Sequence, residues 1–198
     1  MKLGFMASHN GSTAMAIVKA IRDGELPAGI ACFISNNKEA PALGAAAALG
    51  IPCYHLSSRT HPDADDLDAA IRDTLLQHGA THVVLSGYMK KLGPKTLAAF
   101  HNRILNVHPS LLPKYGGKGM YGRRVHEAVL EAGESVTGVT VHLADDEYDH
   151  GNIVAQCQVP VLAGDTPETL AARVQAEERK LFVSVLRDIA TGRLSLDG

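Results

Sequence analysis

Short apolar runs alternate with helix-prone segments through the first hundred residues, and this alternation constrains the fold more than any other feature of the sequence. Strands are expected at residues 3–7, 29–35, 53–56, 83–85 and 104–107. The segments between them show helical spacing of apolar residues or are rich in alanine. Strands and helices in alternation are joined by right-handed crossovers. The sequence therefore predicts an α/β fold with a Rossmann-like, mostly parallel, twisted sheet and helices on both faces.

The order of elements changes after a glycine-rich loop at residues 115–122. A helix at 123–132 is followed by two neighbouring strands, at 136–143 and 153–161, which we expect to form an antiparallel addition to the sheet. A long helix closes the chain, with Thr166 as the expected N-cap and Pro167 as its first residue. No composition break, linker or repeat divides the sequence, so residues 1–198 are predicted to form a single domain.

Charge and cysteine content exclude several classes of function. The net charge is -2 and no run of five like charges occurs, so neither a nucleic-acid nor a membrane partner is expected. No stretch approaches the roughly 20 apolar residues of a membrane span. Cys32, Cys53 and Cys157 are far apart and form no CxxC pair, which favours a reducing, cytoplasmic compartment. The 10 histidines show no metal-binding spacing, so no metal is expected.

Asn106 and His108 lie two positions apart at the end of an expected strand, so their side chains point to the same side. Ligands of open α/β sheets bind beyond the carboxyl ends of the strands. An amide and an imidazole placed there can polarise a carbonyl group and stabilise an oxyanion. The alternative is that Asn106 caps a loop and His108 is a hydrogen-bonded edge histidine.

The strand at 136–143 and the acidic loop after it form a second candidate group. Thr140 and His142 share one face of the strand, and Asp149 follows in the loop. A carboxylate near an imidazole raises the pKa of the imidazole and can organise a water for proton transfer. The acids at 145–147 are better interpreted as solvated, and for Asp149 both interpretations remain open.

The turn Asn10-Gly11-Ser12-Thr13 lies between the first strand and the first helix. Its backbone N–H groups and the helix N-terminus can hold a phosphate. An ordinary turn with a serine cap is equally compatible with the pattern.

In the last helix, Glu178 falls on the apolar stripe that includes Val174 and Leu181, three residues after Gln175. A carboxylate at a core-facing position needs a partner. A substrate amine or hydroxyl would serve, and an arginine such as Arg173 or Arg179 is the alternative.

Six motifs, in this order, resemble the folate-dependent formyltransferases. They are N-G-S at 10–12, S-G-Y-M at 86–89, N-V-H-P-S-L-L-P-K-Y at 106–115, G-V-T-V-H at 138–142, D-E-Y-D-H-G at 146–151 and R-V-Q-A-E-E at 173–178. The resemblance covers almost the whole chain, and its third motif is specific to these transferases and related hydrolases. The first and last motifs are typical of the branch that formylates phosphoribosylglycinamide in purine biosynthesis.

The resemblance implies direct formyl transfer from 10-formyltetrahydrofolate, a co-substrate, to the glycine amine of phosphoribosylglycinamide, with Asn106, His108 and Asp149 as catalytic residues. The residues implied for the ribonucleotide are Asn10, Gly11, Ser12, Thr13, Gln175 and Glu178. Those implied for folate are Met89, Lys90, Leu92, Thr140, Leu143, Ala144 and Asp145. Residues 1–100 would form the nucleotide- and phosphate-binding half and 101–198 the folate-binding and catalytic half, in a monomer or homodimer.

Two alternatives remain at this point. The first is a 10-formyltetrahydrofolate hydrolase or a formyltransferase for another amine; such relatives usually carry an extra domain, for which we expect no room in this chain. The second is a non-catalytic nucleotide-binding module on the same fold. Departures from the family pattern include Lys90, where an arginine is common, and a longer glycine-rich stretch at 116–124.

Overall fold

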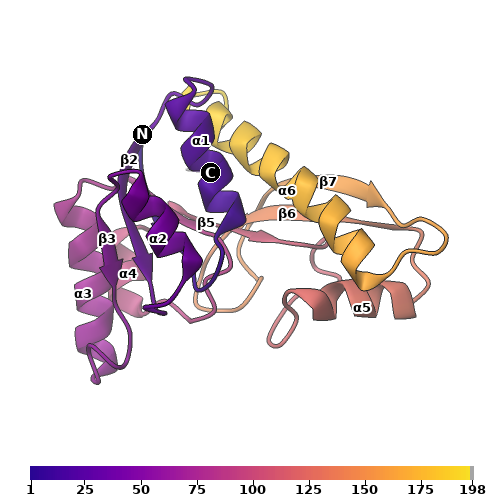
Figure 1. The fold of residues 1–198 in the computed structure, drawn as a ribbon, viewed down its shortest axis with the longest axis horizontal. Coiled ribbons are helices and arrows are strands. Elements are labelled where there is room, and N and C mark those ends of the chain that lie inside the picture. The colour runs from indigo at the N-terminus through magenta and orange to yellow at the C-terminus, as the bar shows by residue number, and fades with distance from the viewer. Residues whose placement is uncertain (197–198) are drawn as a thin grey trace.

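The computed structural model describes residues 1–196 and contains one seven-stranded sheet (Figure 1). Its strands are β1 (Lys2–Met6), β2 (Gly29–Ser35), β3 (Cys53–His55), β4 (His82–Leu85), β5 (Ile104–His108), β6 (Val136–Leu143) and β7 (Ile153–Pro160). The order is β3-β2-β1-β4-β5-β6-β7. The strands from β1 to β5 pair in parallel, whereas β6 and β7 are antiparallel. The predicted sheet is confirmed, and the strand ends differ from the expected ones by no more than one residue.

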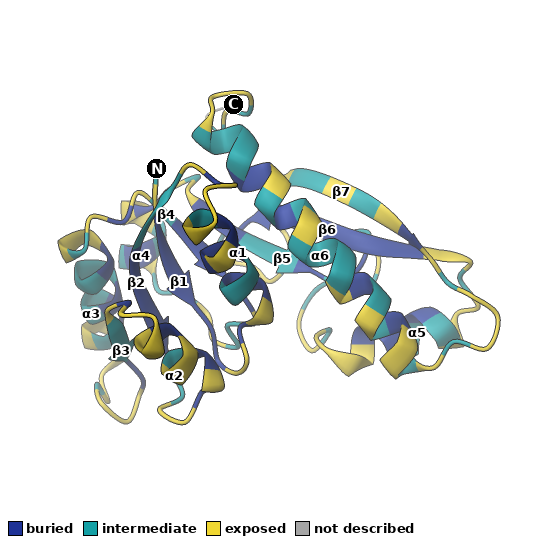
Figure 2. Ribbon diagram, turned by 45° about the horizontal axis from the view of Figure 1, so that its top comes forward, coloured by how far each residue is buried: buried dark blue, intermediate teal, exposed yellow. Residues whose placement is uncertain are grey.

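Helices cover both faces of the sheet, as predicted. They are α1 (Ser12–Arg22), α2 (Pro41–Ala48), α3 (Ala64–Gln77), α4 (Pro94–Ala99), α5 (Arg123–Glu131) and α6 (Pro167–Ala190). The apolar faces of α1, α2 and α6 pack on one side and those of α3 and α4 on the other. Figure 2 shows buried residues on the inner sides of the helices and exposed ones outside. No helix among residues 1–196 is long and apolar enough to cross a membrane.

Helix α6 begins as the sequence predicted. The Thr166 hydroxyl accepts a hydrogen bond from the N–H of Thr169 at 3.3 Å, and Pro167 is the first helical residue. The helix packs on β6 and β7 and then runs beside α1 (Figure 1). It therefore brings residues of the second half of the chain to the first loop of the molecule.

The direction of the chain reverses at β1, and this reversal positions the candidate site. The chain runs outward from β1 to β3 and then returns to β4 on the opposite side of β1. The loops after these two strands meet: Ser86 N–H donates to the Met6 carbonyl at 2.9 Å, and Ser8 N–H to the Gly87 carbonyl at 3.1 Å. Such switch points are where open α/β sheets bind ligands. The end of β5, with Asn106 and His108, lies next along the same edge.

Candidate functional site

Two neighbouring strands bring an amide and two imidazoles to one side of the sheet. In the antiparallel pair of β5 and β6, Asn106 is opposite His142 and His108 is opposite Thr140. Asn106 Nδ2 lies 3.1 Å from His142 Nε2. Asn106 is thus inside a strand and binds a side chain, so the alternative that it caps a loop is wrong.

His108 is buried, and both of its ring nitrogens face oxygen atoms. Its Nε2 lies 2.7 Å from the carbonyl oxygen of Tyr115, and its Nδ1 lies 3.3 Å from Oδ2 of Asp149. A carbonyl and a carboxylate can only accept hydrogen bonds. Both contacts are therefore hydrogen bonds at the same time only in the imidazolium form, in which both nitrogens donate.

Asp149 brings a carboxylate from the loop between β6 and β7 to both imidazoles. Its Oδ1 lies 3.5 Å from His142 Nε2, and its Oδ2 accepts a hydrogen bond from the N–H of Gly117 at 3.0 Å. Burial favours the neutral carboxyl, but the hydrogen bonds from His108 and His142 outweigh it and hold the pKa of Asp149 well below its usual range. With a side chain only 10% exposed, this residue is not one of the solvated acids of the loop.

The two residues whose oxygens face His108 both have a left-handed backbone. The φ angle is 57° at Tyr115 and 57° at Asp149. This conformation costs a non-glycine residue roughly 1–2 kcal/mol, and least for Asn or Asp. Strain of this size persists where surrounding contacts hold it, and it concentrates at functional sites. Of the three non-glycine residues with positive φ among residues 1–196, two thus belong to the group that the hydrogen bonds mark, and the third, Asn102, follows α4.

His142 is a residue of this group that we did not predict as catalytic. Its Nδ1 donates to the carbonyl of Leu143 at 2.9 Å, which leaves Nε2 facing Asn106 and Asp149. The signal in the sequence was its alternation with Thr140 on one strand face. Only the register of β5 against β6 shows that this face meets Asn106.

Thr140 stabilises the turn next to the site. It is fully buried, and its hydroxyl donates to the Ser110 carbonyl at 2.7 Å. The same oxygen accepts from the N–H of Leu112 at 3.0 Å and from Gln156 Nε2 at 2.8 Å. Its hydrogen-bonding capacity is thus used inside the protein. These bonds make Thr140 a support for the turn that follows His108, and its contact with folate stays a prediction.

The turn before α1 has the features of an anion site. Gly11 is the N-cap, with φ 54° and no side-chain cap, so the serine-capped alternative is wrong. A Cβ at Gly11 would lie 3.0 Å from the Cβ of Ala42, so both the backbone angle and the close approach require glycine. Within residues 1–196, no group accepts a hydrogen bond from the N–H of Ser12 or Thr13. These two donors at a helix N-terminus suit a phosphate.

Glu178 of α6 is joined to this turn. The Thr13 hydroxyl donates to Glu178 Oε1, across 165 positions of sequence. Burial raises the pKa of Glu178, and this hydrogen bond opposes the rise. Arg173, one of the expected partners, instead binds Asp165 with two bonds of 2.7 and 2.8 Å. The structure thus brings together the residues expected to bind phosphate and ribose, with Gln175 exposed on α6 one turn before Glu178.

The residues expected to bind folate lie on two segments that contact each other. They are Met89, Lys90 and Leu92 between β4 and α4, and Leu143, Ala144 and Asp145 at the end of β6. Between these segments, Lys91 Nζ donates to the Asp146 carbonyl and lies 5.5 Å from the centre of the Tyr148 ring. The contact ties the loop that carries Asp149 to the segment after β4.

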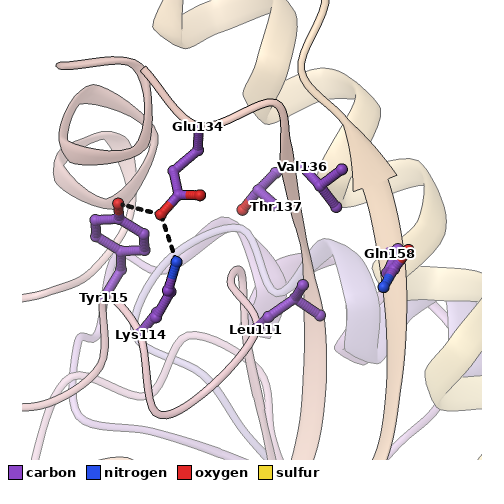
Figure 3. Close-up of a pocket in the computed structure, with 7 residues that line it drawn as sticks. All are labelled: Leu111, Lys114, Tyr115, Glu134, Val136, Thr137 and Gln158. Carbon is purple, nitrogen blue, oxygen red and sulfur yellow. Dashed lines mark hydrogen bonds and ion pairs between the residues drawn. The ribbon is translucent and has the colours of Figure 1, made fainter. Parts of the chain in front are cut away.

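A surface hollow lies at the opposite end of β6 from His142. It is lined by Leu111, Lys114, Tyr115, Glu134, Val136, Thr137 and Gln158. Figure 3 shows the Glu134 carboxylate facing two of the other polar side chains: it accepts from the Tyr115 hydroxyl at 2.9 Å and from Lys114 Nζ at 2.7 Å. Because these groups bind each other, we do not assign the hollow to the reacting centre. The hydrogen bond from Tyr115 to Glu134 instead holds Tyr115 in place, and the carbonyl of Tyr115 contacts His108.

His126 of α5 is a second histidine that we did not predict as part of the site. It is buried, and its Nδ1 has no hydrogen-bond partner among residues 1–196. Burial lowers the pKa of His126, and the nearby charge of His108 lowers it further. In the described part of the chain, no group of three or more His, Cys, Asp or Glu side chains is arranged to hold a metal ion.

Comparison with known proteins identifies a family and several similar chains. Residues 1–186 match the family described as Formyl transferase. The phosphoribosylglycinamide formyltransferase of Haemophilus influenzae is 37% identical over 98% of this chain and 90% of its own length. The chloroplastic phosphoribosylglycinamide formyltransferase of Arabidopsis thaliana is 40% identical over 98% of this chain, which spans only 66% of that relative's length. The crystal structure of glycinamide ribonucleotide transformylase 1 from Symbiobacterium toebii superimposes with a TM-score of 0.92 and 37% identity, over 100% of this chain and 91% of the other.

Proposed function

Because this chain belongs to the formyl transferase family, we propose that it transfers the formyl group of 10-formyltetrahydrofolate to the glycine amine of 5'-phosphoribosylglycinamide, a step of purine biosynthesis. The observation that carries the proposal is the convergence of Asn106, His108 and Asp149 from a strand and a distant loop. These groups suit acyl transfer, in which charge develops on a carbonyl oxygen.

The ribonucleotide would lie between α1 and α6. The N–H groups of Ser12 and Thr13 would donate to its phosphate, beside the exposed Asn10. Glu178 and Gln175 would accept from or donate to the ribose hydroxyls. The hydrogen bond between Thr13 and Glu178 supports this arrangement, because it holds the Glu178 carboxylate, which would bind the ribose, next to the turn that would bind the phosphate.

The folate co-substrate would lie between the segment after β4 and the end of β6. The N–H groups of Leu143 and Ala144 already donate to the Asn152 and Ile104 carbonyls, both at 2.9 Å. Contacts from this part of the chain would therefore use carbonyl oxygens, which suit the amino and N–H donors at the edge of a pterin ring. The donor and acceptor set of the chain thus fits the proposed co-substrate.

In the proposed reaction the glycine amine forms a bond to the formyl carbon, and the bond from that carbon to the folate nitrogen then breaks. One proton leaves the attacking amine and one is gained by the leaving nitrogen, so the transfer needs no covalent enzyme intermediate. Asn106 Nδ2–H and His108 Nε2–H would stabilise the charge on the formyl oxygen, the latter by exchanging its neutral Tyr115 acceptor for the substrate. Asp149 would accept a hydrogen bond from His108 Nδ1 and so orient the imidazole, and His142 Nε2 would offer an acceptor for the proton in transit.

A spectroscopic assay tests this function. Protein is mixed with phosphoribosylglycinamide and 10-formyl-5,8-dideazafolate, and deformylation of the folate analogue is followed by absorbance. We expect turnover only when the ribonucleotide is present. Turnover without the ribonucleotide would indicate a hydrolase, and no turnover in its presence would favour a non-catalytic binding module.

Compartment and assembly belong to the same proposal. We propose a cytoplasmic enzyme that is a monomer or a homodimer, although two plant relatives bear the word chloroplastic in their names. Cell fractionation and sedimentation equilibrium test these two statements directly.

A further inference from the structure

Ser8, in the loop between β1 and α1, uses every one of its hydrogen-bonding groups. Its side chain is buried, with the residue only 2% exposed. The N–H donates to the Gly87 carbonyl at 3.1 Å, and the Ser8 carbonyl accepts from Asn37 Nδ2 at 3.3 Å. The hydroxyl donates to Asn36 Oδ1 at 2.5 Å and accepts from the N–H of Met89 at 2.8 Å. One small residue therefore joins three loops at the switch point of the sheet.

These bonds connect the two segments to which we assign the two substrates. Ser8 is two residues before the turn at 10–13, where the ribonucleotide phosphate would lie, and Met89 begins the segment assigned to folate. The bond from Met89 N–H to Ser8 Oγ is a direct link between them. A second link lies deeper, where the N–H of Ala14 donates to Ser86 Oγ at 3.1 Å.

We propose that the Ser8 hydroxyl is a positioning group, which sets the distance between the glycine amine on one segment and the formyl carbon on the other. The inference rests on the proposed function, because the distance between the two segments affects the rate only if each segment binds one of the two substrates. Reaction requires the joining atoms to approach to about 3–3.5 Å, and a displacement of about 1 Å can reduce the rate by roughly 100-fold. A link that fixes the two segments relative to each other therefore acts on turnover rather than on either binding site alone.

Serine is well suited to this position because its hydroxyl donates and accepts at the same time within a small volume. Alanine would leave the Met89 N–H and the Asn36 amide oxygen without this partner in a part-buried site. We expect the segment after β4 to shift in order to find another acceptor. The phosphate donors at 12 and 13 are untouched by the change.

The test compares Ser8→Ala with the wild-type protein in turnover and in binding. We expect kcat to fall by roughly 10- to 100-fold, while the Kd values for phosphoribosylglycinamide alone and for 5,8-dideazafolate alone change by less than about threefold. We also expect the coupling, the factor by which saturating dideazafolate tightens phosphoribosylglycinamide binding, to fall toward one. Asn36→Ala, which leaves the bond from Met89 in place but removes the partner that orients the hydroxyl, should give a smaller loss of kcat. It serves as the test variant if Ser8→Ala does not fold.

Thr96→Val is the matched control. Thr96 is fully buried, and its hydroxyl donates to Asp68 Oδ1 at 2.5 Å between α4 and α3, outside both proposed substrate segments. It should lower Tm by a few degrees, as we also expect of Ser8→Ala, but leave kcat unchanged. A kcat of Ser8→Ala within threefold of wild type, or an equal loss in Thr96→Val, would overturn the inference. If the wild-type protein gives no turnover, the proposed function fails. The inference is then tested by the binding coupling between the two ligands, and a coupling in Ser8→Ala equal to that of wild type overturns it.

Discussion

Replacing Asp149 by asparagine tests the electrostatic basis of the reacting centre, because it removes one charge and keeps the shape of the side chain. The carboxylate faces His108 Nδ1 at 3.3 Å and His142 Nε2 at 3.5 Å, and its side chain is only 10% exposed. Solvent therefore screens these interactions weakly.

The expected loss of activity follows from the shorter of the two distances. Two unit charges 3.3 Å apart attract each other by about 5 kcal/mol at an effective dielectric constant of about 20. This attraction applies when His108 is protonated. Its charge is then spread over the ring and Asp149 gives up hydration, so we retain about half, roughly 2–3 kcal/mol. If this energy is lost in the transition state, kcat falls by about 30- to 150-fold.

The measurement is steady-state kcat for Asp149→Asn with phosphoribosylglycinamide and 10-formyl-5,8-dideazafolate. Asp146→Asn is the control, since it removes a carboxylate of the same loop whose side chain is exposed. We expect its kcat to equal that of wild type. The reasoning is refuted if Asp149→Asn keeps kcat within threefold, or if the control loses as much activity.

Four further outcomes follow from the same structure. His108→Ala should lower kcat by at least about 100-fold with little change in Tm, as the loss of an oxyanion contact does; a near-normal rate would remove His108 from the mechanism. Glu178→Gln should raise the free energy of unfolding at pH 7 but not at pH 4, because burial raises the pKa of this carboxyl and the ionised form is penalised above that pKa. The same substitution should weaken binding of the ribonucleotide but not of folate. Equal losses of affinity for both ligands would contradict the ribose assignment. Gly11→Ala should destabilise the protein by about 1–3 kcal/mol in urea unfolding, and by more than Gly24→Ala. Gly24 also has a positive φ, but no atom lies within 4 Å of a Cβ added there. Equal losses of stability in the two variants would show that the close approach of Ala42 to Gly11 has no effect. The pKa of Asp149 is depressed in the folded state, so the stability that this carboxylate contributes should be present above the unfolded pKa of about 3.9. It should be lost as the pH falls toward the folded pKa. A difference in the free energy of unfolding between wild type and Asp149→Asn that persists unchanged at pH 2 argues against this.

The sequence by itself determined the elements and the directions of their side chains. The apolar runs and helical spacing predicted the sheet to within a residue at each strand end, and the two-residue spacing of Asn106 and His108 placed them on one strand face. These properties are local, because they depend on the period of a strand or a helix and on few neighbouring residues. Prediction was least complete where a side chain found its partner far along the chain.

Tertiary structure alone decided those partners. The register of β5 against β6 placed His142 opposite Asn106, and the path of α6 beside α1 placed Glu178 against the hydroxyl of Thr13. The same packing buried Thr140 under the site. A periodic pattern says which face a residue occupies, but pairing between distant segments depends on how whole elements pack, and that information is not contained in any local stretch of sequence.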